Sequence, residues 1–231
     1  LSDTVIITTG YNYADALSIS PYAYASKTPI LLTNEDGSLR NETKAALKDG
    51  GFKKVIIVGG TAVVSEETEE YLKQELSATV LRLYGTSRYK TSAEIIRWEL
   101  GLKTDAEFQP EVVMTTEGMG VARADEFADA LSSVSLLGKT GSVLLLLHKT
   151  EDASVDQAVI DELIRPYAKE MTTGYIFGGT AAISEQTETL LNETVKSAFE
   201  DPANWIVPNL FESAYGMLAS VFRSDPFKAG Y

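Results

Sequence analysis

The sequence predicts an α/β protein of tandem Rossmann-like units, each with a short parallel sheet flanked by helices. Short β-branched runs alternate with amphipathic segments, which is the pattern of β-α-β units. The same order of segments then occurs a second time: Ala-Asp-Ala-Leu-Ser at 14–18 returns at 128–132, and Gly-Gly-Thr-Ala at 59–62 returns at 178–181. The chain therefore contains a duplicated unit, and its period exceeds the roughly 20–50 residues of solenoid repeats, which indicates globular units.

The spacing of the two copies indicates where they differ. Asp15 and Asp129 are 114 residues apart, whereas Thr9 and Thr116 are 107 apart. The Gly-Gly pairs are 119 apart, so this alignment implies insertions of 7 and 5 residues in connecting segments. We expect a first repeat over 1–78 that lacks its N-terminal part, a second repeat over 79–200 and a helical tail over 201–231.

The expected elements follow from the apolar runs between turn signals. Continuous apolar stretches such as Val55–Val58 and Val143–Leu147 fit strands that are buried on both faces. We expect strands near 4–9, 29–33, 54–59, 79–84, 111–116, 142–147 and 174–178. Apolar residues at helical spacing predict helices near 13–26, 39–50, 65–76, 89–101, 125–138, 154–170, 184–199 and 210–222.

Several helix starts carry recognisable polar residues. Ser65 and Ser184 each precede a glutamate and are expected to be N-caps. Asp15 and Asp129 fall in the first turn of their helices, where capping or the helix dipole is a sufficient reason for a carboxylate. The last expected helix has an apolar face, which would cover an exposed repeat face or else dock a partner or a second copy.

Composition excludes several kinds of site. The 231 residues include no cysteine and a single histidine, His148, which excludes disulfides, thiol nucleophiles and histidine-clustered metal sites. A formal net charge of −13 argues against a general nucleic-acid binder, which needs a basic surface. No apolar run reaches the roughly 18–20 residues of a membrane-spanning helix, and the first residues lack the features of a signal peptide.

Catalytic motifs are missing from the sequence as well. It has no phosphate-binding G-x-x-x-x-G-K-[ST] loop, and the dinucleotide pattern that starts at Gly118 fails at Arg123. There is no G-x-S-x-G hydrolase motif, and one histidine cannot serve equivalent sites in two copies. His148 follows a strand and is expected in an exposed loop. We therefore predict no catalytic residue, no cofactor and no metal.

Polar residues gather where the strands are expected to end, which is where parallel α/β sheets bind ligands. They are Thr8, Thr9, Asn12, Thr33, Asn34 and Thr61 in the first copy, and Thr115, Thr116, His148 and Thr180 in the second. Their hydroxyls and amides suit recognition of a sugar polymer, and they equally satisfy loop backbone. The densest basic stretch contains Arg82, Arg88, Lys90 and Arg97 and lies between the copies.

An ordered set of motifs resembles a known family. The strand before Thr-Thr-Gly, the Ala-Asp-Ala-Leu-Ser segment, the Gly-Gly-Thr-Ala turn and the later Gly85-x-x-Arg88-Tyr89-x-Thr91 are similar to the cell wall binding repeat 2 family, over roughly Leu1 to Leu191. The resemblance implies a secreted, S-layer associated surface protein of Gram-positive bacteria whose repeats carry no catalysis. It also implies non-covalent anchoring to an anionic cell-wall polysaccharide or a teichoic-acid-like polymer.

The resemblance further implies an array and a set of binding residues. Such repeats usually occur in threes about a pseudo-threefold axis, so a further repeat or a homo-oligomer would complete the array. The ligand-binding candidates are Thr9, Asn12, Asp15, Arg88, Tyr89, Lys90, Thr91, Thr116 and Asp129. We also hypothesise an ion pair between Arg88 and Asp129. The alternatives are a structural assembly module, or a small-molecule-binding or hydrolytic α/β enzyme domain with a perturbed carboxylate pair in a closed pocket.

Overall fold

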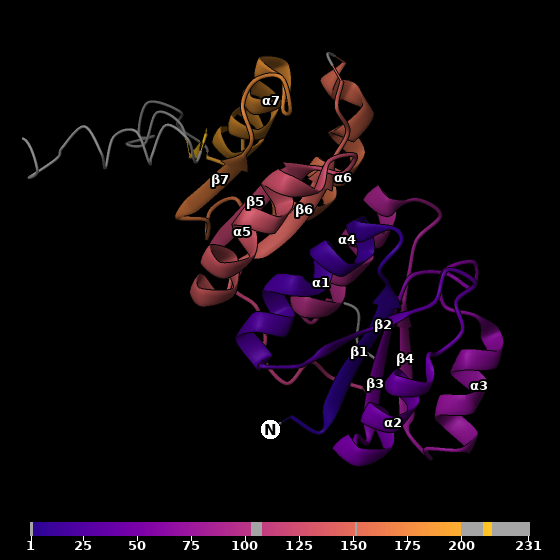
Figure 1. Ribbon diagram of the computed structural model, residues 1–231. Coiled ribbons are helices and arrows are strands. Elements are labelled where there is room, and N and C mark those ends of the chain that lie inside the picture. Colours follow the sequence, from indigo (N-terminus) through magenta and orange to yellow (C-terminus); the bar gives the residue numbers. More distant parts are fainter. Residues whose placement is uncertain (1, 103–107, 151, 200–209, 214–231) are drawn as a thin grey trace, which may run out of the picture.

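The computed structural model describes residues 2–102, 108–150, 152–199 and 210–213 (Figure 1). The first unit is a parallel four-stranded sheet in the order β2-β1-β3-β4. Its strands are β1 (Thr4–Thr9), β2 (Ile30–Thr33), β3 (Lys54–Val58) and β4 (Thr79–Leu83). Its helices are α1 (Tyr13–Ser26), α2 (Asn41–Gly50), α3 (Glu66–Gln74) and α4 (Arg88–Glu99).

The second unit repeats this topology with a parallel sheet in the order β6-β5-β7-β8. Its strands are β5 (Gly118–Arg123), β6 (Val143–Leu147), β7 (Thr173–Phe177) and β8 (Phe211–Ser213). Its helical elements are α5 (Phe127–Thr140), η1 (Ala153–Asp156), α6 (Gln157–Leu163), η2 (Arg165–Tyr167) and α7 (Glu185–Lys196). The expected fold class, tandem Rossmann-like units with short parallel sheets, is confirmed.

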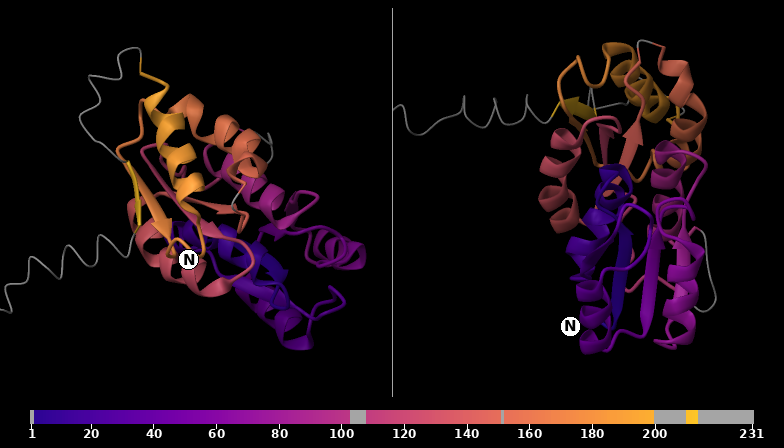
Figure 2. Two further views of the ribbon diagram at one scale, coloured as in Figure 1. Left: turned by 90° about the horizontal axis from the view of Figure 1, so that it is seen from above. Right: turned by 45° about the vertical axis from the view of Figure 1, so that its right-hand side comes forward.

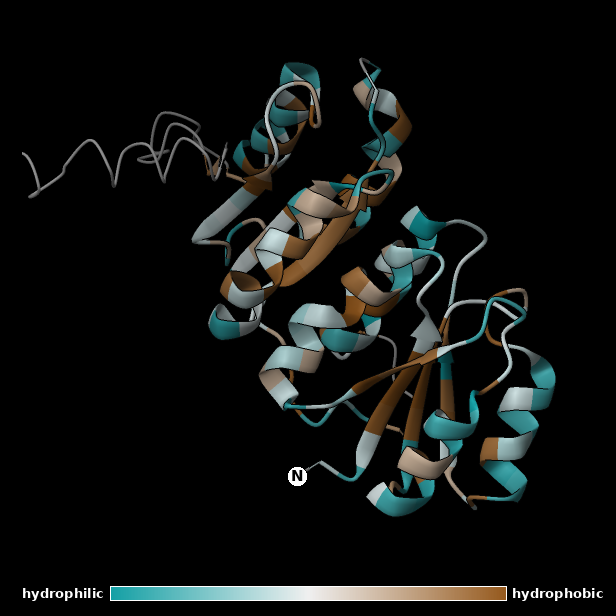
Figure 3. Ribbon diagram, viewed as in Figure 1, coloured by the Kyte–Doolittle hydropathy of each residue, from teal (hydrophilic) through white to brown (hydrophobic). Residues whose placement is uncertain are grey.

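Helices cover both faces of the first sheet (Figure 2). Alternate residues of β1 enter different cores: Ile6 packs with Ile19 of α1, whereas Val5 and Ile7 pack with Leu47 of α2 and other residues on that face. This follows from the two-residue period of a strand. Hydropathy follows the same layering, since the strands are apolar and the solvent faces of α2 and α3 are polar (Figure 3).

The two units share one apolar core. Ile19 of α1 and Trp98 of α4 belong to the same buried cluster as Val121 of β5 and Leu145 of β6. The helix α1 packs against α5, and α4 packs against both α1 and β6 (Figure 1). The helix α4, which follows the first sheet in the chain, therefore packs against the second sheet. Residues at the start of α4 lie near both units.

The expected strand over 111–116 is wrong, because the strand that pairs with β6 and β7 is β5. Val113 in the expected segment is 66% exposed. The pairing of Gly120 with Leu144 repeats that of Ile6 with Ile30, 114 residues earlier. The copies thus align without a gap from the first strand to the second, and only the later insertion of five residues, between β6 and β7, remains.

The end of the chain also differs from expectation. A helix is expected over 210–222, but Phe211–Ser213 form β8, and residues 214–222 lie outside the described part. Because β8 pairs with β7 as β4 pairs with β3, it completes the second sheet. The sheets accordingly divide the chain after β4, whereas the expected repeat boundary precedes that strand.

The expected N-caps are confirmed, and one expected helix is broken. Ser65 Oγ accepts a hydrogen bond from the Thr68 amide, and Ser184 Oγ accepts one from the Thr187 amide. The segment expected as a helix over 154–170 consists of η1, α6 and η2. Pro166 explains the break, since it donates no backbone hydrogen bond and disfavours helical geometry at the preceding residue. Within the described residues, no helix combines the length and the apolar character needed to cross a membrane.

Candidate functional site

A tight turn between β4 and α4 positions the basic motif. A Cβ atom on Gly85 would stand 2.5 Å from the carbonyl carbon of Lys90, so only glycine fits there. The Gly85 amide donates a 3.0 Å hydrogen bond to Thr91 Oγ1, and Ser87 Oγ caps the helix by accepting from the Lys90 amide. Thr91 is therefore buried and structural, whereas the turn presents the side chains of Arg88, Tyr89 and Lys90 at the start of α4.

Arg88 joins the two units. Its Nη1 donates a 3.0 Å hydrogen bond to the carbonyl oxygen of Ala124, just after β5. It also lies near Asp15 at the start of α1, which is 7% exposed. Burial raises the pKa of Asp15 to about 6, and the positive charge of Arg88 lowers it in part. Arg88 and Asp15 thus form a charged junction between the first and second units.

The hypothesis of an ion pair between Arg88 and Asp129 is wrong, because no ion pair of the described residues joins them. The charge of Asp129 instead helps raise the pKa of Arg123, behind the larger effect of the hydrogen bonds from Arg123 to Asp125. Asp129 is half-buried, and its carboxylate lies against Gly178. The basic neighbour of Asp15 is therefore Arg88, whereas that of Asp129 is Arg123.

Tyr89 lies on the side of α4 that faces the second sheet. Its ring stacks on the ring of His148, with the centroids 3.3 Å apart and the planes at 22°. His148 Nδ1 lies 2.7 Å from Asp156 Oδ1, and the His148 amide donates a 3.0 Å hydrogen bond to Asp156 Oδ2. Since the Asp156 side chain is 1% exposed, this carboxylate fixes both the backbone and the ring of the histidine.

The remaining candidates do not all reach this junction. Thr9 is buried and accepts a hydrogen bond from the Tyr11 amide, while Asn12 caps α1 by accepting from the Ala14 amide. Thr116 precedes β5, at the opposite edge of the sheet, and its hydroxyl donates to Glu170. The expectation that Thr116 stands at a carboxyl edge is wrong, because the strand begins two residues after it.

Sequence reasoning missed part of the site. His148 was expected in an exposed loop and among the polar residues at the strand ends, but its stacking on Tyr89 and its contact with Asp156 were not predicted. The spacing of eight residues between the two, across a 3-10 turn, carries no recognised motif. The acceptor at Ala124 is a backbone carbonyl and has no signature in the sequence.

The charges of the basic stretch are not equally available. Arg82 is paired with Glu69, and Arg97 is paired with both Glu94 and Glu162. None of the ion pairs among the described residues includes Arg88 or Lys90. A groove of about 620 Å³ lies beside them, between α4 and the η1–α6 segment. Its lining includes Tyr89, Lys90 and His148.

Fold and site together define a tandem α/β module whose basic motif lies at the junction of its two parallel-sheet units. The profile of the family described as "Cell wall binding domain 2 (CWB2)" matches residues 1–69 and 82–188, so the chain belongs to this family. The chain is accordingly a cell wall binding module that takes a cell wall polymer as its partner at the cell wall or cell surface.

Two curated relatives from Bacillus subtilis (strain 168) agree with this assignment. The chain is 32% identical over 183 residues to "N-acetylmuramoyl-L-alanine amidase LytC", covering 79% of the chain and 32% of the relative. It is 33% identical over 191 residues to "Amidase enhancer", covering 82% of the chain and 23% of the relative. The matches thus span about a third or less of the length of these relatives.

Two solved structures of cell wall proteins have a similar fold. Cwp6 from Clostridium difficile superposes with a TM-score of 0.68 at 25% identity, covering 84% of this chain and 28% of that one. Cwp8 from the same organism gives a TM-score of 0.64 at 24% identity, covering 87% and 32%. The tandem parallel-sheet architecture is therefore shared with these proteins.

Proposed function

We propose that this module is secreted and anchors its parent protein non-covalently to an anionic cell-wall polysaccharide through the junction around Arg88. The observation that carries the proposal is that Arg88 and Lys90 stay out of the ion pairs that engage the neighbouring Arg82, Arg97 and Arg123. An acidic polymer group is a fitting partner for the two cations. Tyr89, Asn12, Asp15 and Asp129 are the other proposed contacts, whereas the candidates Thr9 and Thr91 are buried and Thr116 lies at the opposite end of its sheet.

The overall negative charge does not oppose this proposal at short range. The chain has a formal net charge of −13, which repels an anionic polymer from a distance. At physiological salt, screening acts over about 8 Å, so the basic residues at the contact determine the local potential. Binding through Arg88 and Lys90 should then weaken as the salt concentration rises.

The buried carboxyl of Asp15 supports a functional role for the junction. An aspartate whose pKa is raised by burial costs stability near neutral pH, because its ionised form is poorly solvated. Such groups cluster at functional sites, where binding rather than folding stability retains them. We infer that Asp15 sets the position of Arg88 and limits the depth to which an anionic ligand enters.

The test compares charge removal at the junction with equal charge removal elsewhere. Purified Bacillus subtilis walls are mixed with the wild-type chain, with Arg88→Gln/Lys90→Gln, and with the control Lys48→Gln/Lys53→Gln, which alters exposed lysines around α2. The fraction that sediments should fall several-fold for the first variant only, and wild-type binding should disappear once acidic polymers are stripped from the peptidoglycan. Equal retention of both variants would show that the junction does not bind the wall.

We also propose that the module itself has no enzymatic activity and that any activity of the parent protein lies in other parts of it. The enzyme alternative asks for a pair of perturbed carboxylates, whereas the perturbed Asp15 lies beside an arginine. The test is to incubate the purified chain with walls and to measure soluble muropeptides and new reducing ends. Release of either above the background of walls alone would overturn this part of the proposal.

A further repeat is the partner that we propose for the outer face of α5. Leu17 of α1 is 8% exposed and packs with second-unit residues such as Leu144, whereas the equivalent Leu131 of α5 is 55% exposed. Phe127, beside it on α5, is 52% exposed. The face that one unit presents to the next is thus covered in the first copy and open in the second. The repeat boundaries over 1–78, 79–200 and 201–231 stay a prediction about the repeated sequence unit, which need not coincide with the division of the chain into two sheets.

Sedimentation velocity tests whether this face self-associates. If a second copy of the chain can act as the further repeat, the wild-type chain should form a larger species as its concentration rises. Phe127→Ser/Leu131→Ser should keep it monomeric, because these exposed side chains supply the apolar contact. A wild-type chain that stays monomeric would exclude a second copy as the occupant and restrict the proposal to a repeat of the parent protein.

A further inference from the structure

The groove between α4 and the η1–α6 segment combines an aromatic surface with apolar and polar walls. The stacked rings of Tyr89 and His148 line it together with Val155, Ala158 and Val159 of the η1–α6 segment. Lys90 and Glu162 add polar groups to the lining. Pockets that bind small ligands have this composition, mostly apolar with a few polar groups that fix orientation.

The histidine in this groove is held in one orientation. Its Nδ1 and its backbone amide both contact the buried carboxylate of Asp156, at 2.7 and 3.0 Å. The His148 side chain is 33% exposed, and Nε2 is the ring nitrogen that remains for a ligand. A ring fixed in this way loses little conformational freedom when a ligand packs on it.

The charged side chains that line the groove, two basic and three acidic, do not make it basic. Arg97 is held between Glu94 and Glu162, so these three side chains do not form a basic patch. The cations that no ion pair of the described residues engages here are Lys90, which lines the groove, and Arg88, two residues before it on α4. The groove itself is better suited to a neutral ligand that has an apolar face and polar edges.

We propose that this groove is a subsite for one uncharged pyranose residue of the wall polymer, adjacent to the anionic group that Arg88 and Lys90 bind. The proposal rests on the proposed function. The C–H face of a pyranose ring packs on aromatic side chains, and its hydroxyls can bond to His148 Nε2, Lys90 and Glu162. Polymer recognition would thus divide between charge at the junction and ring shape in the groove.

Titration with simple sugars tests the subsite directly. His148 is the only histidine of the chain, so its ring signals in an NMR spectrum are assigned without ambiguity. Methyl glucoside and methyl N-acetylglucosaminide are added separately to the wild-type chain and to Ala158→Arg, which places a long side chain in the groove from an exposed helix position. Ala46→Arg makes the same change on the exposed face of α2 and is the control.

The result expected is a shift of the His148 ring signals with at least one sugar in the wild-type chain and in Ala46→Arg, and no shift in Ala158→Arg. No shift in the wild-type chain with either sugar would overturn the subsite. Wall sedimentation of the same proteins separates this inference from the proposed function. If the wild-type chain sediments with walls but shows no sugar shift, the anchoring role stands and the subsite is overturned. If the sugar shift occurs but the chain does not sediment, the groove binds sugar and the anchoring role is overturned.

Discussion

Asp15 lies so close to Gly59 that a Cβ atom on that glycine would stand 2.8 Å from Oδ2 of the carboxylate. The second copy repeats the arrangement, with a Cβ on Gly178 placed 2.6 Å from Asp129 Oδ2. Both glycines have a positive φ, 113° and 115°. The aspartate of the Ala-Asp-Ala-Leu segment and the first glycine of the Gly-Gly-Thr-Ala turn therefore form one packed unit at the end of the central strands.

This packing predicts a large difference between two adjacent glycines. Gly178→Ala should destabilise the fold by about 1–3 kcal/mol, because it combines a strained backbone with a clash against Asp129. Gly179→Ala should change stability by less than about 0.5 kcal/mol, since nothing lies within 4 Å of the added carbon. Urea denaturation of the two variants measures the difference. Equal urea midpoints would show that the contact between Asp129 and Gly178 does not require a glycine at position 178.

The sequence predicted most strands because their residues are apolar on both faces, and β5 shows why one was missed. Its Gly-Met-Gly start has low strand propensity, whereas the nearby Val112-Val113 pair has high propensity but is exposed. A Cβ on Gly120 would stand 2.7 Å from Leu137 and 2.8 Å from Phe177. Close packing of α5 and β7 against β5 thus requires glycine at position 120. Strand propensity does not reflect such a packing constraint.

The strand β8 was missed for a related reason. Its three residues, Phe-Glu-Ser, are too few and too polar to signal a strand. A signal did exist in the register: Tyr-Gly follows β4 at 84–85, and Tyr-Gly stands at the matching distance after β8, at 215–216. The motif likewise found Arg88 and Tyr89, but their partners Ala124 and His148 became visible only through tertiary contacts.

Asp15 gives the chain a pH-dependent stability. Its pKa is about 6 in the folded chain and 3.8 as the ordinary value, so the folded state holds the proton more tightly. Its contribution to stability is complete below about pH 4 and is lost as the pH rises through about 6, a change of at most about 3 kcal/mol. Asp15→Asn should therefore be more stable than wild type above about pH 7 and nearly equal to it near pH 4. Thermal melts of both proteins at the two pH values measure this difference. A stability gain of Asp15→Asn that is the same at both pH values would contradict the raised pKa of Asp15.

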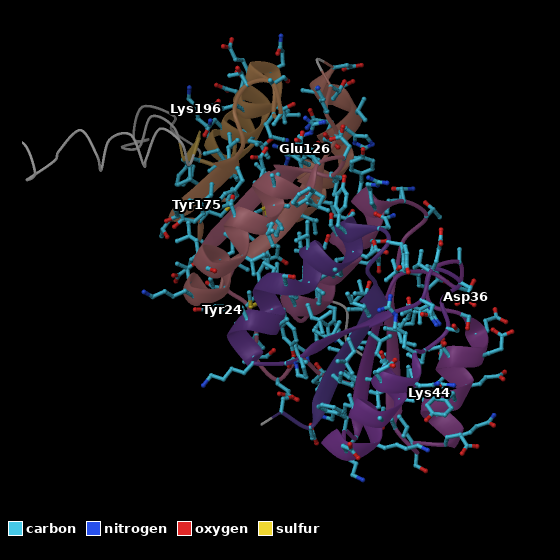
Figure 4. The ribbon with its side chains drawn as sticks, in the orientation of Figure 1. Tyr24, Asp36, Lys44, Glu126, Tyr175 and Lys196 are labelled. Carbon is cyan, nitrogen blue, oxygen red and sulfur yellow. The ribbon has the colours of Figure 1, made fainter. Side chains whose placement is uncertain are left out.

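The contact between α1 and α5 predicts a coupled pair of mutations. A Cβ on Gly138 would stand 2.6 Å from the ring of Tyr24, which lies on α1 where it meets α5 (Figure 4). Gly138→Ala should cost about 1–3 kcal/mol through overpacking. In a Tyr24→Ala background the same change should be neutral or stabilising by up to about 1 kcal/mol, because the clash is gone and alanine favours the helix. A double-mutant cycle by urea denaturation measures this coupling. Additive effects would mean that the Tyr24 side chain does not limit the size of the residue at position 138.

Glu99, at the end of α4, is fully buried, and neither of its carboxyl oxygens has a hydrogen-bond partner among the described residues. Burial raises its pKa well above 4.5, so its protonated form is the one that the core tolerates. The contribution of Glu99 to stability is therefore present at acidic pH and is lost as the pH rises above about 4.5 toward its folded pKa.

Glu99→Met removes both unpaired oxygens at similar volume and should stabilise the chain by about 1–3 kcal/mol. The gain should grow from about pH 5 to about pH 8, in contrast to Glu99→Gln, which keeps buried polar atoms that lack partners. Urea midpoints of the three proteins at both pH values measure it, and a Met variant less stable than wild type at both would mean that Glu99 is held by a favourable polar contact.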